Sequence, residues 1–185
     1  EVDFFVSHSW HDDNVKKWAR LQEFAQAFEQ EFKRPPKLWL DNVCINQTKV
    51  NESLKVLPIN LMSCNRMLII IGRTYPFRLW CAWELLTLFV FSSEAHTVER
   101  AEVLRLDEQD FDALGELESF DVSNAHCYDP NEEARLRMVI QAVGAERFNG
   151  RIRALAKALR NRESHRYSGS STSSSAATKL AQMVA

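Results

Sequence analysis

The chain has 185 residues, of which 45% are hydrophobic and 26% are charged, a balance typical of one globular domain with a real core. Its formal net charge of -2 argues against a nucleic-acid or anionic-membrane partner, because domains that track phosphates are plainly basic. Small ligands and other proteins are the expected partners.

Four cysteines are spread along the chain without a CxxC pair: Cys44, Cys64, Cys81 and Cys127. This spacing indicates neither a zinc site nor a redox motif, so we expect no metal and reduced thiols in the core. The sequence begins within a predicted strand, without a methionine or an apolar leader. We therefore expect a fragment of a longer, cytoplasmic protein. The longest apolar run, 79–91, is shorter than the roughly 20 residues that span a bilayer.

The first predicted elements are a strand and an amphipathic helix. Residues 2–6 form a short apolar stretch. Apolar residues then recur at helical steps of three and four: Val15, Trp18, Leu21, Ala25, Phe28 and Phe32. Asp12 or Asp13 can cap this helix, and Pro35–Pro36 ends it before a second strand at 38–40. These elements form a βαβ unit.

The middle of the chain is predicted to hold the central strand. Residues 41–53 are polar and irregular, which indicates a long loop, and a short helix that contains a proline follows over 54–62. Residues 67–71 are apolar throughout and end at Gly72, as a parallel strand covered on both faces requires. Residues 77–91 are apolar nearly all round and predict a buried helix.

The last third predicts further strands and helices. A fourth strand is expected over 103–106, followed by an acidic loop or short helix over 107–118. A fifth strand is expected within 118–128. Asp129 before a proline is a helix-start signature, and Gly144 is the expected end of that helix.

One more helix and a tail complete the chain. The helix is predicted from Ile152, Leu155 and Leu159. The serine-rich segment 168–177 is of low complexity and predicts a flexible linker. We accordingly divide the chain into a domain over 1–163 and a tail over 164–185.

Alternating strands and helices predict an α/β, flavodoxin-like, three-layer domain with a central parallel sheet of about five strands. Such sheets bind ligands at the carboxyl ends of their strands, where the strand order reverses. In the flavodoxin-like order this crevice lies between the first and third strands. The segments expected to face it are 7–13 and 72–84, with 41–47 beside them.

Glu84 is the strongest candidate for a functional residue. It and Thr87 are the only polar residues of the run 79–91, so its carboxylate lies on an otherwise buried helix. Desolvation raises the pKa of a carboxyl, and such perturbed groups cluster at active sites. The alternative is a structural glutamate that caps a loop amide or pairs with Arg73 or Arg78. Position alone does not decide between the two.

The polar and aromatic loop over 7–13, SHSWHDD, can contact ligand phosphate or ribose groups through hydroxyls and amides. The alternative is turn formation and helix capping, which we favour for Asp12 and Asp13. For Ser7 and Trp10 both interpretations stay open. The two histidines of the loop have no third partner at a metal-ligand spacing.

Familiar nucleotide motifs are absent. The five glycines are too dispersed for GxGxxG or a P-loop, which argues against hydride transfer and kinase chemistry. A basic stretch over 147–162 can touch phosphates, but most such runs are solvated helix faces, and we interpret it as one.

Four segments resemble TIR (Toll/interleukin-1-receptor) domains in order and spacing. They are Asp3-Phe-Phe-Val-Ser-His-Ser-Trp, Leu38-Trp-Leu-Asp, Leu68-Ile-Ile-Ile and Trp80-Cys-Ala-Trp-Glu-Leu. The last is the most specific. It is similar to the WCxxEL motif of plant and related TIR domains, in which the glutamate is catalytic for NAD cleavage, and that position here is Glu84. The string WLDNVCINQ from Trp39 also resembles fungal heterokaryon-incompatibility domains, which are themselves regarded as TIR-like.

The resemblance implies a signalling hydrolase that cleaves the nicotinamide–ribose bond of NAD, with NAD as substrate rather than cofactor and Glu84 as the catalytic carboxylate. Further residues are expected to contact the substrate: Ser7, His8, Trp10, Asp41, Tyr75, Trp80 and Cys81. The alternative is a non-catalytic scaffold that assembles with other TIR domains through the loop 41–54. Both can hold, because family enzymes typically complete their site as homo-oligomers. A weaker alternative is a nucleotide sensor or an enzyme for another nucleoside.

Overall fold

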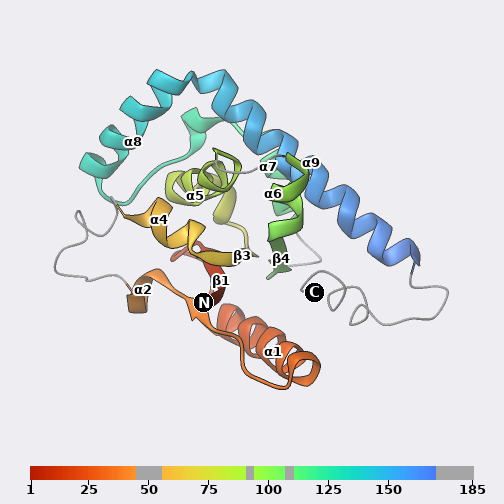
Figure 1. The fold of residues 1–185 in the computed structure, drawn as a ribbon. Helices are drawn as coiled ribbons and strands as arrows, with labels where there is room; N and C mark the ends of the chain where they lie inside the picture. The colour runs from red at the N-terminus through yellow and green to blue at the C-terminus, as the bar shows by residue number, and fades with distance from the viewer. Residues whose placement is uncertain (45–55, 91–93, 107–110, 170–185) are drawn as a thin grey trace.

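The computed structural model describes residues 1–44, 56–90, 94–106 and 111–169 (Figure 1). Its parallel sheet has four strands in the order β2-β1-β3-β4. Their bounds are β1 (Val2–His8), β2 (Leu38–Trp39), β3 (Cys64–Ile71) and β4 (Ala101–Arg105). The chain leaves β1 toward β2 and then returns past β1 to β3, so the strand order reverses between β1 and β3. The α/β, flavodoxin-like architecture is confirmed.

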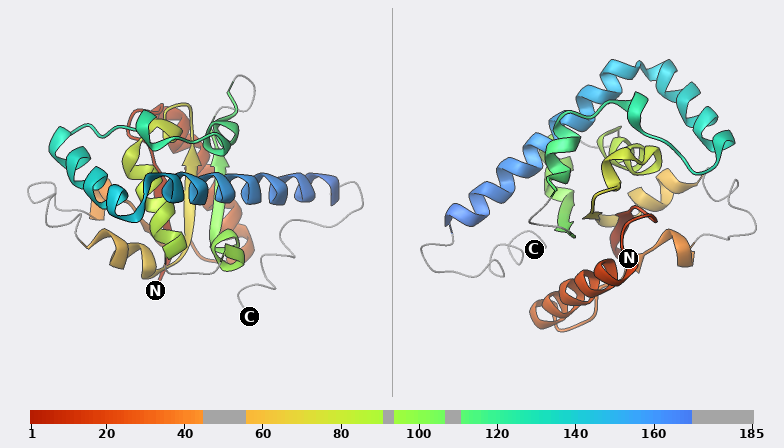
Figure 2. Two further views of the ribbon diagram at one scale, coloured as in Figure 1. Left: turned by 90° about the horizontal axis from the view of Figure 1, so that it is seen from above. Right: turned by 180° about the vertical axis from the view of Figure 1, so that it is seen from behind.

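Helices cover both faces of this sheet, in three layers (Figures 1 and 2). On one face α1 (Asn14–Phe32) packs on Phe4, Val6, Leu68 and Ile70. The opposite face carries α4 (Leu57–Met62), α5 (Leu79–Val90) and α9 (Ala145–Gly169), packed on Phe5, Met67 and Ile69. The two sets of strand residues alternate, as side chains on a pleated strand must. The remaining elements are α2 (Asp41–Cys44), the 3₁₀ turn η1 (Tyr75–Phe77), α6 (Glu94–Arg100), α7 (Ala113–Glu118), the 3₁₀ turn η2 (Val122–Asn124) and α8 (Pro130–Val143).

The expected fifth strand is wrong for the described residues. The segment that was to supply it forms η2, in which Asp121 accepts a hydrogen bond from the Ser123 backbone N–H at 2.9 Å. Side chains of this type favour a turn over an extended ladder because they offer the backbone a local partner. A single bridge, Arg78 to His126, is the pairing that links this segment to the start of α5.

The first helix differs from its predicted pattern in its first turns. Asp13 is the N-cap and accepts from the Val15 and Lys16 amides at 2.8 and 3.0 Å. Val15 and Trp18 were expected in the core but are 79% and 61% exposed. At 3.6 residues per turn, Val15 lies on the side of α1 away from Leu21 and Phe28, and Trp18 lies beside, not on, the face that these two residues bury. Lys17 is buried there instead, and its ammonium donates to the Ser9 carbonyl at 2.6 Å.

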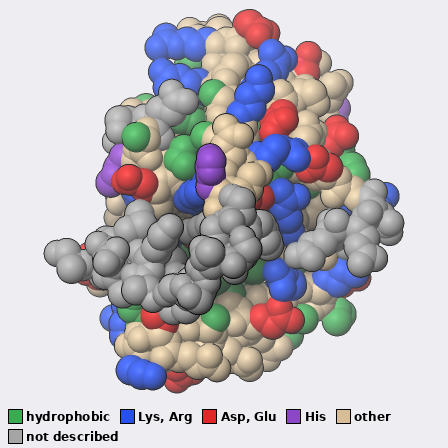
Figure 3. All heavy atoms as spheres, turned by 90° about the vertical axis from the view of Figure 1, so that its right-hand side faces the viewer, with side chains coloured by type: hydrophobic (Ala, Val, Ile, Leu, Met, Phe, Trp, Pro, Cys, Tyr) green, Lys and Arg blue, Asp and Glu red, His purple; other side chains and the backbone are tan. Residues whose placement is uncertain are grey.

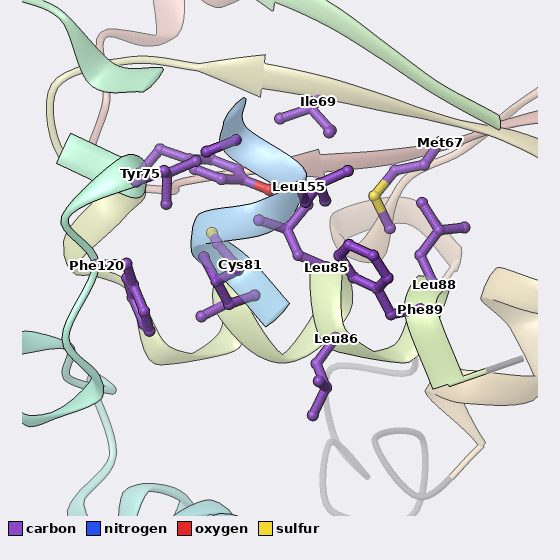
Figure 4. Close-up of a cluster of buried hydrophobic side chains, with 14 of the residues drawn as sticks. Met67, Ile69, Tyr75, Cys81, Leu85, Leu86, Leu88, Phe89, Phe120 and Leu155 are labelled. Atoms are coloured by element: carbon purple, nitrogen blue, oxygen red, sulfur yellow. The ribbon is translucent and has the colours of Figure 1, made fainter. Parts of the chain in front are cut away.

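The core between sheet and α5 is dense and apolar (Figure 4). Leu85 and Leu88 of α5 are at most 1% exposed, as are Met67 and Ile69 of β3. Burying a side chain of this size stabilises the fold by about 1.5–3 kcal/mol. The buried central strand and the buried helix predicted from the apolar runs are therefore both confirmed.

The four cysteines carry no disulfide. Cys64 and Cys81 are buried, as expected, and Cys127 is partly so. Cys44 is exposed on α2, so its expected place in the core is wrong. Residues 41–44 form this short helix at the start of the expected loop, and 45–53 lie outside the described residues. No helix in the described parts of the chain is both long and apolar enough to cross a membrane.

The basic residues of α9 are not a purely solvated face, and that expectation is wrong. Arg153 donates to the Phe120 carbonyl at 2.8 Å, and Arg160 pairs with Glu118 at 2.6 Å. Arg162 donates to backbone carbonyls beside β4. These arginines connect α9 to α7, to the segment that follows α7 and to the start of β4. The helix continues past residue 163 to Gly169, and 170–185 lie outside the described residues.

The surface around the end of α9 is of mixed charge. Figure 3 shows basic and acidic side chains interspersed on the face that forms the right-hand side of Figure 1. Ion pairs such as Arg105–Glu163, at 2.6 Å, account for part of this mixture. Interspersed charges give no extended field of one sign, which agrees with the small net charge of the whole chain.

Candidate functional site

A cleft of about 480 Å³ opens at the carboxyl end of β1. Its walls come from the loop after β1, from α2, from the first turns of α5 and from the start of α8. This is the edge of the sheet where the strand order reverses and where α/β folds bind their ligands. Six of the residues expected at the site line it: His8, Trp10, Asp41, Trp80, Cys81 and Glu84.

Glu84 lies in the wall of this cleft and is 8% exposed. The Ser7 hydroxyl donates to its Oε2 at 2.6 Å, and the Tyr75 hydroxyl lies 2.7 Å from Ser7 Oγ. With the carboxylate ionised, Tyr75 donates to Ser7 and Ser7 donates to Glu84. The carboxyl thus ends a chain of hydroxyl groups that runs from the core to the cleft.

Ser7 and Tyr75 stand behind Glu84 and do not line the cleft. They are 0% and 1% exposed. Tyr75 belongs to the hydrophobic cluster of α5, together with Cys81 and Leu85 (Figure 4). Its ring therefore has no free face for a ligand. Both residues act on the site through the carboxyl group rather than through direct contact in this conformation.

The environment of Glu84 disfavours its charged form. Burial raises the pKa of its carboxyl to about 8, the negative charge of Asp41 adds to the rise, and the hydrogen bond from Ser7 opposes it. The carboxyl is therefore mostly protonated near neutral pH. Within the described residues no hydrogen bond or ion pair joins Glu84 to Arg73 or Arg78, the two arginines considered as structural partners. Arg73 instead lies over the Phe111 ring, 5.3 Å from its centroid.

The Cys81 thiol is an unsuitable nucleophile despite its place in the cleft. Burial, followed by the nearby charge of Glu84, raises its pKa well above the ordinary value. Its Sγ lies 3.5 Å from the His8 carbonyl oxygen, to which it donates. The contact joins the first turn of α5 to the end of β1, so Cys81 helps to hold the two walls together.

Two tryptophans on different walls are each held by a carboxylate. Trp10 Nε1 donates to Asp41 Oδ2 at 2.6 Å, and His8 Nε2 lies 3.2 Å from the other oxygen of Asp41. Trp80 Nε1 donates to Glu132 Oε2 at 2.9 Å. A tethered indole offers a flat apolar face in a fixed orientation. Trp10 is 53% exposed and is the more accessible of the two.

Hydrogen bonds join the loop after β1 to the loop after β3, and we call this group of Ser9, Asp12 and Thr74 the clasp. Asp12 Oδ1 accepts from the backbone N–H and the hydroxyl of Thr74, both at 2.8 Å, and the hydroxyls of Ser9 and Thr74 are 2.7 Å apart. Gly72 lies beneath: a Cβ at this position would come 2.5 Å from Asp12 Oδ2. Asp12 is therefore a link between loops, not a helix cap.

Several contacts of the site were not anticipated from the sequence, among them those of Lys17, Thr74 and Glu132, although Thr74 lies in the segment 72–84 that was expected to face the cleft. Lys17 is charged and was not among the apolar residues from which the first helix was predicted, so its burial was not expected. Thr74 follows β3 as Asp12 follows β1, so the rule that parallel strands end at one edge was the available signal. Glu132 lies in the first turn of α8, and its contact with Trp80 bridges 52 positions in sequence.

Among the described residues, no group of three or more His, Cys, Asp and Glu side chains is placed to hold a metal ion. Comparison with protein-family models, curated proteins and solved structures finds no match for this chain.

Proposed function

We propose that the chain is a TIR-like NAD glycohydrolase in which Glu84 is the catalytic carboxylate. The main support is the position of Glu84, a buried carboxyl in the wall of the cleft with one oxygen fixed by Ser7. Carboxyl groups with a strongly perturbed pKa in a cleft are frequent participants in catalysis. The WCAWEL segment adds the resemblance to TIR domains.

The chemistry suits a single carboxylate. The bond between ribose C1′ and the nicotinamide nitrogen breaks, and its electron pair goes to that nitrogen, so nicotinamide leaves neutral without a general acid. The ribose acquires oxocarbenium character, which a nearby carboxylate stabilises electrostatically. Water then adds to C1′ and releases a proton, which gives ADP-ribose. Trp10 and Trp80 are the walls on which a planar ring can stack.

Catalysis requires Glu84 in its charged form, although burial raises the pKa of its carboxyl to about 8 and so favours the neutral form near pH 7. An opposite charge nearby favours ionisation of a carboxyl. The nicotinamide ring of NAD is positively charged, so its arrival beside Glu84 lowers the pKa of the carboxyl and releases the proton. Substrate binding and ionisation are coupled in this scheme.

The test is nicotinamide release from NAD by the concentrated protein. Glu84→Ala and Glu84→Gln are expected to abolish release, whereas Glu99→Gln, which changes a glutamate that is 59% exposed on α6, is expected to retain it. No release by the wild type at high concentration would rule out the enzyme. Equal release by the Glu84 variants would remove this residue from its role.

A second candidate is a scaffold that assembles with further TIR-like domains, including copies of itself, in the cytoplasm. The exposed Val15 and Trp18 favour it, because the two apolar side chains are neighbours on one turn of α1 and contiguous exposed apolar surface can mark an interaction site. Sedimentation of the wild type and of Trp18→Ser across a concentration series tests it. A scaffold without catalysis would self-associate in the Glu84→Gln variant as in the wild type and release no nicotinamide.

A further inference from the structure

Arg78 differs from Asp41, Asp129 and Glu132 of the cleft because its guanidinium group has no ion-pair or hydrogen-bond partner among the described residues. It is the only lysine or arginine that lines the cleft, as far as the structure describes the chain. Neighbouring arginines are engaged: Arg137 pairs with Glu133 at 2.7 Å. The described residues include no hydrogen-bond or ion-pair partner for the Arg78 side chain. A permanently charged fork of donors beside a cleft suits the oxygens of a phosphate or carboxylate.

The carboxylates of the cleft do not neutralise this arginine. Asp41 accepts from Trp10, and Glu132 accepts from Trp80. Asp129 accepts from the Asn131 backbone N–H at the start of α8. The indole and backbone N–H donors are neutral and do not cancel the negative charge of Glu132 or Asp129, whereas Asp41 also contacts His8. A phosphate would therefore be repelled by these carboxylates, and among the described lining residues Arg78 is the arginine or lysine that can offset the repulsion.

Arg78 and Glu84 lie close together in sequence, one just before α5 and the other on it. Arg78 directly precedes α5, and Glu84 lies six positions further on. At 1.5 Å of rise per residue the two backbones are about 9 Å apart along the axis. Both residues line the same cleft. A ribose bound at Glu84 can direct its 5′-phosphate toward the start of α5. The ribose phosphate and the long side chain of Arg78 together can bridge the distance between the two backbones.

We infer that Arg78 binds the phosphate carried by the ribose that reacts at Glu84, and so selects nucleotides over nucleosides. This inference rests on the proposed NAD cleavage, and it assigns the phosphate contact within that same cleft. The ligand class is a nicotinamide nucleotide with at least one 5′-phosphate. The remainder of the dinucleotide is not needed for the Arg78 contact.

The kinetic test compares NAD, nicotinamide mononucleotide and nicotinamide riboside as substrates. Arg78→Ala is expected to lower kcat/KM for both phosphorylated substrates about tenfold or more, mainly through KM, as loss of a hydrogen bond to a charged group does. Riboside cleavage is expected to be unchanged. Arg78→Lys keeps a charge and should fall between. Arg147→Ala, which removes an exposed arginine of α9 outside the cleft, is the matched control.

A binding test separates this inference from the proposed function. ADP-ribose is titrated into the wild type and Arg78→Ala by calorimetry. Weaker binding to Arg78→Ala, with no NAD cleavage by either protein, would support the phosphate contact and contradict the glycohydrolase. The inference is overturned if the variant binds ADP-ribose as tightly as the wild type, if the wild type binds none, or if all three substrates lose activity equally.

Discussion

Ser7 Oγ and Glu84 Oε2 lie 2.6 Å apart, although 77 positions separate the two residues in sequence. The contact joins the carboxyl end of β1 to α5. Among the described residues, Ser7 is the partner that favours the charged form of the Glu84 carboxyl. Burial raises the pKa of that group to about 8, while the Ser7 hydrogen bond lowers it. The strength of this bond thus bears directly on how much of the protein is ready to react at neutral pH.

Ser7→Ala is expected to shift the activity profile to more alkaline pH. Loss of a hydrogen bond to a charged group is worth about 1.5–3 kcal/mol, or roughly one to two pH units in the pKa of Glu84. Nicotinamide release at pH 7 should fall about tenfold or more and recover above pH 9. The pH dependence of kcat/KM measures the shift. Tyr75→Phe keeps the Ser7–Glu84 bond and should move the profile less; a larger shift in that variant would contradict the role given to Ser7.

Glu84→Gln is expected to make the protein more stable at alkaline pH. The carboxyl has a folded-state pKa of about 8 against an ordinary value of 4.5, so the folded chain keeps a proton that the unfolded chain loses between these values. The stability of the wild type is therefore full below pH 4.5 and declines as pH rises through 8. The decline amounts to about 5 kcal/mol.

Urea unfolding of wild type and Glu84→Gln at pH 5, 7 and 9 measures this difference. The advantage of the glutamine variant should grow with pH, because an amide cannot ionise. Parallel stabilities at the three pH values would show that the carboxyl is not held neutral in the folded protein. Greater stability of the inactive variant would also indicate that Glu84 is kept at a cost to the fold, as functional residues often are.

The position of the site could be predicted from local patterns, whereas many of its contacts could not. The apolar runs that became β1, β3 and α5 determine which loops meet at one edge of the sheet, and this placed Glu84 beside the cleft. The burial of Tyr75 had no such signal, since an aromatic residue with a hydroxyl suits a ligand site as well as a core. The bond from Lys17 to the Ser9 carbonyl depends on the path of a loop. Alternation and helical spacing carry no information on such pairings.

Gly72→Ala is expected to destabilise the protein by disturbing the clasp of Ser9, Asp12 and Thr74. The new Cβ would lie 2.5 Å from Asp12 Oδ2, so Asp12 must move and its bonds to Thr74 must lengthen. Overpacking of this kind destabilises a protein by about 1–3 kcal/mol. Chemical denaturation measures the loss. Asp12→Ala removes the colliding carboxylate, so in the double variant the alanine at 72 should add little further loss; additive losses would show that the collision is not the cause.

Loss of the hydrogen bond from Trp80 to Glu132 is expected to weaken substrate binding and to leave the rate of the chemical step unchanged. Trp80→Phe keeps an aromatic ring but removes the Nε1–H that donates to Glu132 Oε2 at 2.9 Å, so the ring is no longer fixed against α8. KM for NAD should rise about threefold to tenfold, since a stacking contact of this kind is worth roughly 0.5–1.5 kcal/mol, and kcat should stay near the wild-type value. Glu132→Gln keeps an acceptor for the indole and should have the smaller effect. A fall in kcat without a change in KM would place Trp80 at the reacting bond instead of the binding wall.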